Sequence, residues 1–223
     1  MELQLPKGTR DLKPEQAIIR KHIVDVLKKT FELYGFSPLE TPIFERYDVL
    51  SSKYAGGAEI LKETFKFKDQ GDRELALRYD LTVPMCRFIA MNPNMKLPFK
   101  RYQVGEVFRD GPIATARYRQ FTQCDVDIVG NASVKADAEI LILTNRAFKK
   151  LGFEPIIKVN NRKILNEILD YAKLDQEQHD AAILSIDKLE KIGMKEVKKE
   201  MESKGIDAEC IAAVESIITL KGT

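Results

Sequence analysis

The chain has 223 residues, of which 44% are hydrophobic and 31% charged, and its formal net charge is +2. This length can bury the core of one large domain or two small ones, and the near balance of charge gives no global signature of a nucleic-acid-binding protein. Three widely spaced cysteines argue against a disulfide framework or a zinc site. With no signal segment, and no apolar run near the roughly 18 residues of a membrane span, we expect a protein of the reducing cytoplasm.

The first predicted element is an amphipathic helix that begins at Pro14 and stops at Gly35. Proline suits a first helical turn, and apolar residues then recur at helical spacing until the glycine. Residues 36–44 read as extended chain. Because Pro38 and Pro42 lack the backbone N–H that an interior strand needs, the sequence predicts an edge or interface strand here.

Residues 63–79 read as two short strands around the turn at residues 69–72, and a helix over residues 80–90 follows. Asp80 then stands at the start of that helix. A carboxylate at this position accepts hydrogen bonds from free backbone N–H groups and stabilises a helix by about 1 kcal/mol. Such a capping role is compatible with a second role in binding a substrate.

Two strand-like runs between Arg101 and Gly130, joined by a turn at residues 110–116, carry the strongest functional signal in the chain. In the second run, alternate residues form a face that changes in order from arginine through phenylalanine to amide and carboxylates: Arg117, Arg119, Phe121, Gln123, Asp125 and Asp127. The opposite face, which includes Cys124, Val126 and Ile128, is expected to pack. A polar face of this order suits an elongated ligand that presents phosphate, base and amine in turn.

The first run, residues 99–109, places Arg101, Gln103, Gly105 and Arg109 beside that polar face. A glycine inside a strand has two readings here, either room for a ligand near the backbone or a β-bulge. Gly111-Pro112 is a strong turn signal, and the connection is long enough to fold over a bound group.

Beyond the hairpin, Ser133 is expected to cap a helix over residues 134–151, and residues 153–159 read as one more strand. Residues 160–223 then give short Leu-, Ile- and Ala-rich helices, with breaks near Ser185, Gly193 and Gly205. The sequence therefore predicts two parts, residues 1–159 and a helical module over residues 160–223.

The two parts differ in charge. Residues 161–223 carry 10 Lys and Arg against 13 Asp and Glu, which leaves +5 for residues 1–160. This distribution mildly favours a polyphosphate or RNA ligand near the hairpin, although solvated lysines on ordinary helices are the alternative. His22 and His179 have no partner at metal-ligand spacing, so we expect both on helix surfaces.

Four stretches of the chain match the motifs of one family in the right order. Residues 6–11, Pro-Lys-Gly-Thr-Arg-Asp, look like its opening signature, and residues 35–45, with Pro42, look like its motif 1. Residues 77–84, Leu-Arg-Tyr-Asp-Leu-Thr-Val-Pro, resemble its substrate-binding segment, and Phe108-Arg109 with residues 117–125 resembles its motif 2. Each match is weak alone, but together they are specific. The chain resembles the histidyl-tRNA synthetases, which are class II aminoacyl-tRNA synthetases.

The resemblance implies an α+β fold, with a class II synthetase-like antiparallel sheet flanked by helices in residues 1–159. Residues 160–223 would form a small all-helical insertion that leans toward the tRNA acceptor stem. It also implies a histidine–tRNA ligase, which uses ATP to activate histidine to histidyl-adenylate and transfers it to tRNA(His). Motif 1 implies a homodimer, with a proline-bearing edge strand of a monomer as the alternative.

The resemblance also implies roles for individual residues. Arg109, the catalytic residue, would contact the α-phosphate of ATP, Arg117 the γ-phosphate, and Phe121 would stack on adenine, with phosphate-bound Mg²⁺ sharing the neutralisation of charge. Asp80, Thr82 and Gln123 match the positions for the α-amino group of histidine, and Asp127 matches that for the imidazole. The structural alternative pairs Asp80 and Asp127 with Arg78 or Arg119 as salt bridges.

Two departures from the family pattern stand out. The acidic residue that class II motif 2 commonly carries two places after its arginine is Gly111 here. The chain also stops at Thr223 without a motif 3 or an anticodon-binding domain, so we expect an N-terminal fragment with weak activity at best. The alternatives are a non-catalytic histidine-binding relative, resembling the regulatory subunit of ATP phosphoribosyltransferase, or a fragment that only dimerises.

Overall fold

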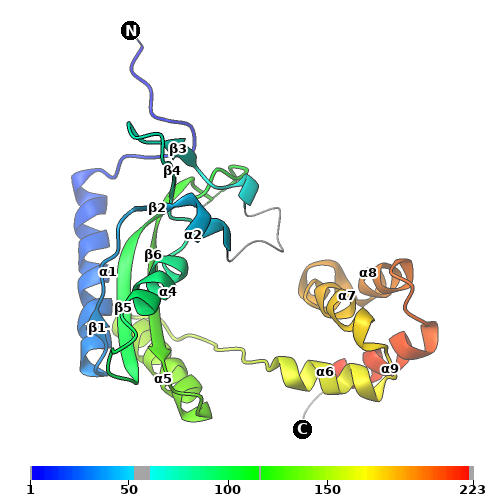
Figure 1. Cartoon of the computed structure of the whole chain (residues 1–223). Helices are drawn as coiled ribbons and strands as arrows, with labels where there is room; N and C mark the ends of the chain where they lie inside the picture. Colours follow the sequence, from blue (N-terminus) through cyan, green and yellow to red (C-terminus); the bar gives the residue numbers. More distant parts are fainter. Residues whose placement is uncertain (1, 53–60, 116, 221–223) are drawn as a thin grey trace. The chain divides into compact units, whose positions relative to one another are not determined.

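The computed structural model describes residues 2–52, 61–115 and 117–220, and it divides into two compact units, Met1–Ile157 and Lys158–Thr223 (Figure 1). The division falls two residues before the position at which we placed it from the sequence. Helices and short sheets together make the chain an α+β protein, which confirms the predicted fold class. Each unit is described by itself below.

The first unit is organised on a three-stranded sheet in the order β1-β5-β6. Strand β1 (Ser37–Pro38) runs parallel to β5 (Phe99–Phe108), and β5 pairs antiparallel with β6 (Gln120–Val129). The register of the long pair is continuous from Phe99 opposite Val129 to Phe108 opposite Gln120. The predicted hairpin is therefore present, although its second strand begins at Gln120, so Arg117 and Arg119 lie in the connection.

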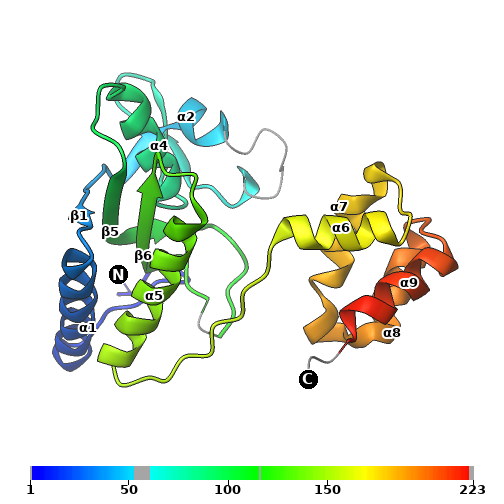
Figure 2. The ribbon, with the colours of Figure 1, turned by 90° about the horizontal axis from the view of Figure 1, so that it is seen from below.

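Helices α1 (Pro14–Leu33) and α5 (Val134–Lys150) cover one face of this sheet, and α4 (Thr82–Met91) lies on the other side (Figure 2). The first face is apolar, because Tyr102 of β5 packs with side chains of both covering helices and the loop after α1: Phe31, Phe36, Leu143 and Ala147. The ends of the helices follow local sequence, as predicted. Pro14 opens α1, Gly35 at φ +77° follows it, and the Ser133 hydroxyl accepts a hydrogen bond from the Lys135 N–H.

A second sheet has the order β2-β4-β3 and contributes the segment that leads into α4. Its strands are β2 (Phe44–Arg46), β3 (Lys66–Lys68) and β4 (Glu74–Leu77), with α2 (Tyr47–Ser52) after β2. The turn predicted at residues 69–72 joins β3 to β4, and Asp69 Oδ1 closes it by accepting hydrogen bonds from the backbone N–H groups of Gly71 and Arg73. As the prolines predicted, β1 and β2 each lie at the edge of their sheet.

The second unit consists of α6 (Arg162–Tyr171), α7 (Gln176–Ile186), α8 (Leu189–Ser203) and α9 (Ala208–Ile218). Its core is built from apolar residues of all four helices and their loops: Leu169, Ala172, Leu174, Ala182, Ile183, Val197, Met201, Ile206, Ile211 and Val214. The predicted breaks correspond to the end of α7 near Ser185, a kink in α8 at Gly193, where φ is +76°, and the end of α8 before Gly205.

Two predictions about residues outside the sheets were wrong. Residues 153–159 form no strand in the described chain, and Ile156 is 90% exposed; an apolar run without a neighbouring strand to pair with remains an extended connection. His179 is buried rather than on a helix surface, with Nε2 3.3 Å from the Leu174 carbonyl oxygen. His179 lies on the side of α7 that packs in the helical unit, where α6 and α8 are its neighbours.

Candidate ligand-binding site

The polar face of the hairpin is present as one continuous surface of β5 and β6. Cross-strand pairing sets Arg101 opposite Asp127, Gln103 opposite Asp125, and Gly105 opposite Gln123, and all of these residues share a face because side chains alternate along a strand. The opposite face packs at one end only. Val126 and Ile128 contact the apolar core, whereas Cys124 is exposed, which corrects the expectation that this whole face packs.

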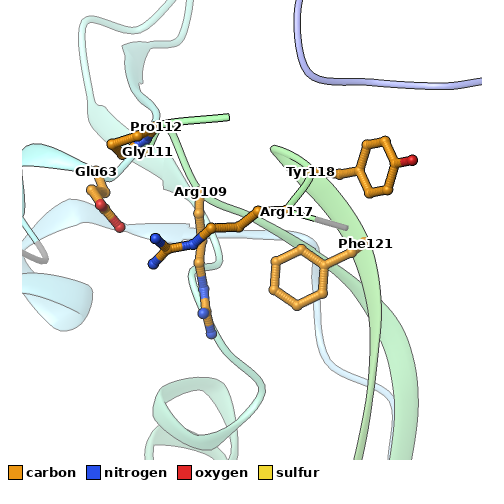
Figure 3. Close-up of a pocket in the computed structure, with 7 residues that line it drawn as sticks. All are labelled: Glu63, Arg109, Gly111, Pro112, Arg117, Tyr118 and Phe121. Atoms are coloured by element: carbon orange, nitrogen blue, oxygen red, sulfur yellow. The ribbon is translucent and has the colours of Figure 1, made fainter. Parts of the chain in front are cut away.

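The arginine end of this face borders a small pocket of about 100 Å³, lined by Glu63, Arg109, Gly111, Pro112, Arg117, Tyr118 and Phe121 (Figure 3). The guanidinium groups of Arg109 and Arg117 both reach into it, that of Arg117 toward Glu63, while the Tyr118 hydroxyl points away. The Arg109 guanidinium carbon lies 5.0 Å from the centre of the Phe121 ring and 4.3 Å from that of Tyr79. Two cations beside an aromatic ring form a surface that can bind a phosphorylated aromatic compound.

Glu63 is a pocket residue that sequence reasoning missed. Its Oε2 accepts a hydrogen bond of 3.0 Å from the Tyr79 hydroxyl, and its backbone carbonyl accepts one of 2.7 Å from the Asp110 N–H. A Cβ at Gly111 would lie 2.8 Å from Glu63 Oε1. The Glu63 carboxylate therefore occupies the space into which a side chain at position 111 would project. The signal that could have found it is the missing acidic residue at that position.

Tyr79 links Glu63 to Arg109. The Arg109 Nε donates to the Tyr79 carbonyl oxygen at 3.3 Å, so the guanidinium is held against the tyrosine ring. Burial raises the pKa of the Tyr79 hydroxyl, and the hydrogen bond to Glu63 raises it further. The tyrosine thus remains a neutral donor that fixes the Glu63 carboxylate at the edge of the pocket.

Further along the polar face lies a cluster of acidic residues around one buried cation. Arg101 is fully buried, and its Nη2 lies 2.6 Å from Asp127 Oδ2 in an ion pair. On the α4 side, the Arg101 Nε lies 2.9 Å from the Met85 sulfur. Burial raises the pKa of Asp125, Gln123 and Arg101 lower it, and Asp127 and Asp80 raise it, so these groups are close enough to interact.

Asp80 reaches this cluster from the start of α4. Its Oδ1 accepts hydrogen bonds from the backbone N–H groups of Thr82, at 3.1 Å, and Val83, at 2.9 Å. The hydrogen bonds predicted for Asp80 are therefore present, although the helix begins at Thr82, with Leu81 as its N-cap residue. Asp80 is buried, with 8% of the residue exposed, so its surroundings fix the position of the carboxylate.

The salt bridges predicted as the structural alternative for Asp80 and Asp127 were to Arg78 or Arg119, and the structure pairs these residues differently. Asp127 pairs with Arg101 instead of Arg119, which lies in the connection and pairs with Asp110 at 2.9 Å. Arg78 donates to backbone carbonyls, including those of Glu106 at 2.7 Å and Thr41 at 2.8 Å. The guanidinium of Arg78 thus ties the hairpin to the segment before β2.

Arg78 also explains Gly105, for which both sequence readings were wrong. A Cβ at Gly105 would lie 2.5 Å from Arg78 Nη2, so the space beside the glycine holds a side chain of the protein and not a ligand. The β5–β6 register passes through Gly105 without a bulge. The glycine is needed because the buried guanidinium packs directly on the backbone of the strand.

One acceptor of the cluster is left for a ligand. Gln123 Oε1 is buried and has no hydrogen-bond partner among the residues that the structure describes. A buried acceptor of this kind is costly unless a donor reaches it. Beside the carboxylates of Asp80 and Asp127, it suits a ligand that carries cationic or neutral N–H groups. The polar face therefore leads from a phosphate-compatible pocket to an ammonium-compatible cluster.

Within residues 2–52, 61–115 and 117–220, no group of three or more His, Cys, Asp or Glu side chains has a geometry that could hold a metal ion. The helices of the described chain include none that is long and apolar enough to cross a membrane.

The family model and the relatives that match this chain all belong to one protein family. The family model described as histidyl-tRNA synthetase matches residues 8–223. A histidine–tRNA ligase of Bacillus cereus is 51% identical over 209 residues, which are 94% of this chain and 49% of the relative. One from Aeropyrum pernix is 41% identical over 97% of this chain and 50% of the relative. The chain thus spans about half the length of the curated relatives it matches.

Solved structures agree with the sequence relatives. The crystal structure of histidyl-tRNA synthetase from Nostoc sp. PCC 7120 superposes with a TM-score of 0.88 and 31% identity, and it covers all of this chain and 50% of that chain. A protein of Bacillus halodurans C, described as an ATP phosphoribosyltransferase regulatory subunit/histidyl-tRNA synthetase, gives a TM-score of 0.80 at 22% identity over 98% of this chain and 56% of that chain. The second likeness shows the fold alone.

Proposed function

Because this chain belongs to the histidyl-tRNA synthetase family, we propose that its β5–β6 face is the part of a histidine–tRNA ligase that binds ATP and histidine. The observation that carries the proposal is the order of groups from the β5–β6 connection along β6. Arg109, Arg117 and Phe121 meet in one pocket, and the same face continues to Gln123 and Asp127. A nucleotide and an amino acid bound side by side need this sequence of cation, aromatic ring and acceptors.

The reaction requires the carboxylate of histidine to attack the α-phosphate of ATP. A new oxygen–phosphorus bond forms, the bond between the α- and β-phosphates breaks, and pyrophosphate leaves, giving histidyl-adenylate. Both reactants are anions, so positive charge must be positioned before they can approach. Arg109 would contact the α-phosphate and Arg117 the γ-phosphate, with Phe121 stacked on adenine. ATP would enter as its Mg²⁺ complex, and the ion would share in neutralising the phosphates.

Recognition of histidine would use the acidic cluster. Asp80, Thr82 and Gln123 would accept hydrogen bonds from the α-amino group, and Asp127 one from an imidazole N–H. Arg101 supports this role, because a buried guanidinium 2.6 Å from Asp127 Oδ2 holds that carboxylate in place and keeps it ionised. An amino acid of similar size without the N–H would leave the carboxylate unpaired and bind much more weakly.

The further partners follow from the same family membership. The activated histidine would be transferred to tRNA(His), with the helical unit, residues 158–223, facing the RNA. The motif 1 region, residues 35–45, would form a homodimer. Its strands β1 and β2 lie at sheet edges, which is compatible with pairing across an interface. The cysteines Cys86, Cys124 and Cys210 are free, as is usual for a protein of the reducing cytoplasm.

The test is ATP–pyrophosphate exchange dependent on histidine, measured on the complete gene product. Arg109→Ala is expected to lower the exchange rate by about 100-fold or more, the loss typical for removal of one preorganised charge-stabilising group. Arg73→Ala is the matched control, because it removes an arginine whose side chain is 78% exposed in the β3–β4 turn. An Arg109→Ala protein that exchanges at the unaltered rate would contradict the assigned role.

Calorimetry separates this proposal from a histidine-binding regulatory protein and from a fragment that only dimerises. A ligase binds both histidine and a nonhydrolysable ATP analogue, a regulatory protein binds histidine alone, and the third binds neither. The pocket with Arg109, Arg117 and Phe121 favours the first outcome, because a histidine sensor does not need a site for phosphate and base.

A further inference from the structure

Asp125 lies between Gln123 and Asp127, two residues to which the family assigns contacts with histidine. It is half-buried on the polar face of β6, opposite Gln103. Its Oδ2 accepts a hydrogen bond of 3.2 Å from the side-chain nitrogen of the neighbouring Gln123. This contact determines what the glutamine can offer to a ligand.

A glutamine amide has two chemically opposite ends, and its rotation by half a turn exchanges a donor for an acceptor. An ionised carboxylate only accepts hydrogen bonds, so the NH₂ end of Gln123 must face Asp125. The oxygen Oε1 then points the other way, where it is buried and has no partner among the described residues. The unsatisfied oxygen is therefore a consequence of the contact with Asp125.

Neighbouring groups do not supply the same constraint. The Gln103 amide, which faces Asp125 across the ladder, is bonded to the Thr41 hydroxyl at 3.0 Å. The residue opposite Gln123 is Gly105, which has no side chain. Arg78 packs against that glycine with its hydrogen bonds directed at the carbonyl groups of Glu106 and Thr41. The hydrogen bond to Asp125 is thus the contact that the structure gives for the Gln123 amide nitrogen.

The electrostatics also fit a cationic ligand. The fully buried Arg101 pairs with Asp127, while Asp80 and Asp125 add two further carboxylates near it. With these groups ionised, the cluster carries more negative than positive charge. Burial makes the ionised form of Asp125 unfavourable and raises its pKa, and the hydrogen bond that Gln123 donates to the carboxylate lowers the pKa and offsets part of that cost.

We propose that Asp125 is a positioning residue that holds the Gln123 amide with its oxygen toward the α-ammonium group of the substrate. This inference rests on the proposed function, and it adds a residue that acts through Gln123 without itself touching the amino acid. It predicts that the effect of Asp125 is confined to ligands with an ammonium group and vanishes when Gln123 cannot form a hydrogen bond.

The experiment is a double-mutant cycle on the complete gene product, with Asp125→Ala, Gln123→Leu and the double variant. Asp125→Ala is expected to weaken L-histidine binding and raise the KM for histidine about tenfold, the usual size of one hydrogen bond to a charged group, with the KM for ATP unchanged. Adding Asp125→Ala to Gln123→Leu should have no further effect. Asp125→Asn should retain most of the affinity, because its amide oxygen can still accept from the Gln123 nitrogen.

A ligand without the ammonium group gives the second readout. Calorimetry with 3-(imidazol-4-yl)propionate, which keeps the imidazole and carboxylate of histidine, should give the same affinity for the unaltered and Asp125→Ala proteins. The proposal is overturned if Asp125→Ala weakens both ligands equally, or if its effect persists in the Gln123→Leu background. If the unaltered protein binds no histidine, the proposed function itself fails, and that outcome is visible without any substitution.

Discussion

The two units of this chain differ in what they bury. The first unit encloses charged and polar side chains beside its sheets: Glu45, Arg78, Asp80, Arg101 and Gln103. The helical unit has an apolar core, and its charged residues form ion pairs at the surface, such as Lys188 with Glu200 and Lys199 with Glu196. The first unit thus buries charged side chains at a cost in free energy, whereas the charged side chains of the helical unit remain in contact with solvent.

The difference shows where stability and function compete. Burying an ion is expensive, and a buried pair seldom stabilises a protein more than well-packed apolar residues would, whereas an exposed pair changes stability little. Two kinds of buried polar side chain can be told apart in the first unit. Arg78 directs its hydrogen bonds to backbone carbonyls and holds segments together. Gln123 instead keeps its buried side-chain oxygen without a partner among the described residues, as a binding surface requires.

The largest expected effect comes from breaking the buried ion pair. Arg101→Met should lower the free energy of unfolding by about 3 to 5 kcal/mol, because it leaves the Asp127 carboxylate beside an apolar side chain. The double variant Arg101→Met with Asp127→Leu should recover most of that loss while binding no histidine. Urea denaturation and calorimetry with histidine measure the two quantities. A double variant that stays as unstable as the single one would show that the pair is retained for stability.

The helical unit should respond in the opposite way. Leu169→Ala is expected to cost about 3 kcal/mol of unfolding free energy, because Leu169 is fully buried in the apolar core of that unit. Histidine affinity should not change. Leu184→Ala is the control, since Leu184 is 60% exposed on α7 and should cost little. A weaker affinity for histidine in the Leu169→Ala protein would break the distinction between the two units.

The smallest effect is a pH dependence at Asp125. Its pKa is raised above the usual 3.8, chiefly by burial, so folding makes protonation of this carboxyl easier than it is in the unfolded chain. The stability contributed by this preference is fully present below pH 3.8 and is lost as the pH rises through the raised pKa. Asp125→Asn should therefore have a higher Tm than the unaltered protein at pH 7, and the difference should shrink as the pH falls.

Thermal unfolding of both proteins between pH 7 and pH 4 measures this effect, with Asp11→Asn as a control at an exposed aspartate. The outcome that would count against it is a lower Tm for Asp125→Asn at pH 7. Such a result would mean that Arg101 stabilises the ionised carboxylate more than burial destabilises it.

Prediction from sequence succeeded where the signals are local. Pro14 and Ser133 mark the starts of helices by their own backbone and hydroxyl chemistry, and the alternation along residues 120–129 defines a strand with one polar face. The sites that sequence missed depend on residues far apart in the chain. Glu63 enters the pocket through Tyr79 and the Asp110 backbone, and neither contact leaves a trace in the spacing of residues.

The amino-acid sequence by itself determined the helix ends, the strand pattern and the order of arginine, phenylalanine, amide and carboxylate along the hairpin, because these follow from neighbours along the backbone. Only the tertiary structure decided that Gly105 makes room for Arg78, that Asp127 pairs with the buried Arg101, and that residues 153–159 form no strand. Each of these outcomes depends on which distant segment fills a given volume and excludes water from it. That choice is made by packing the whole unit, and no local pattern encodes it.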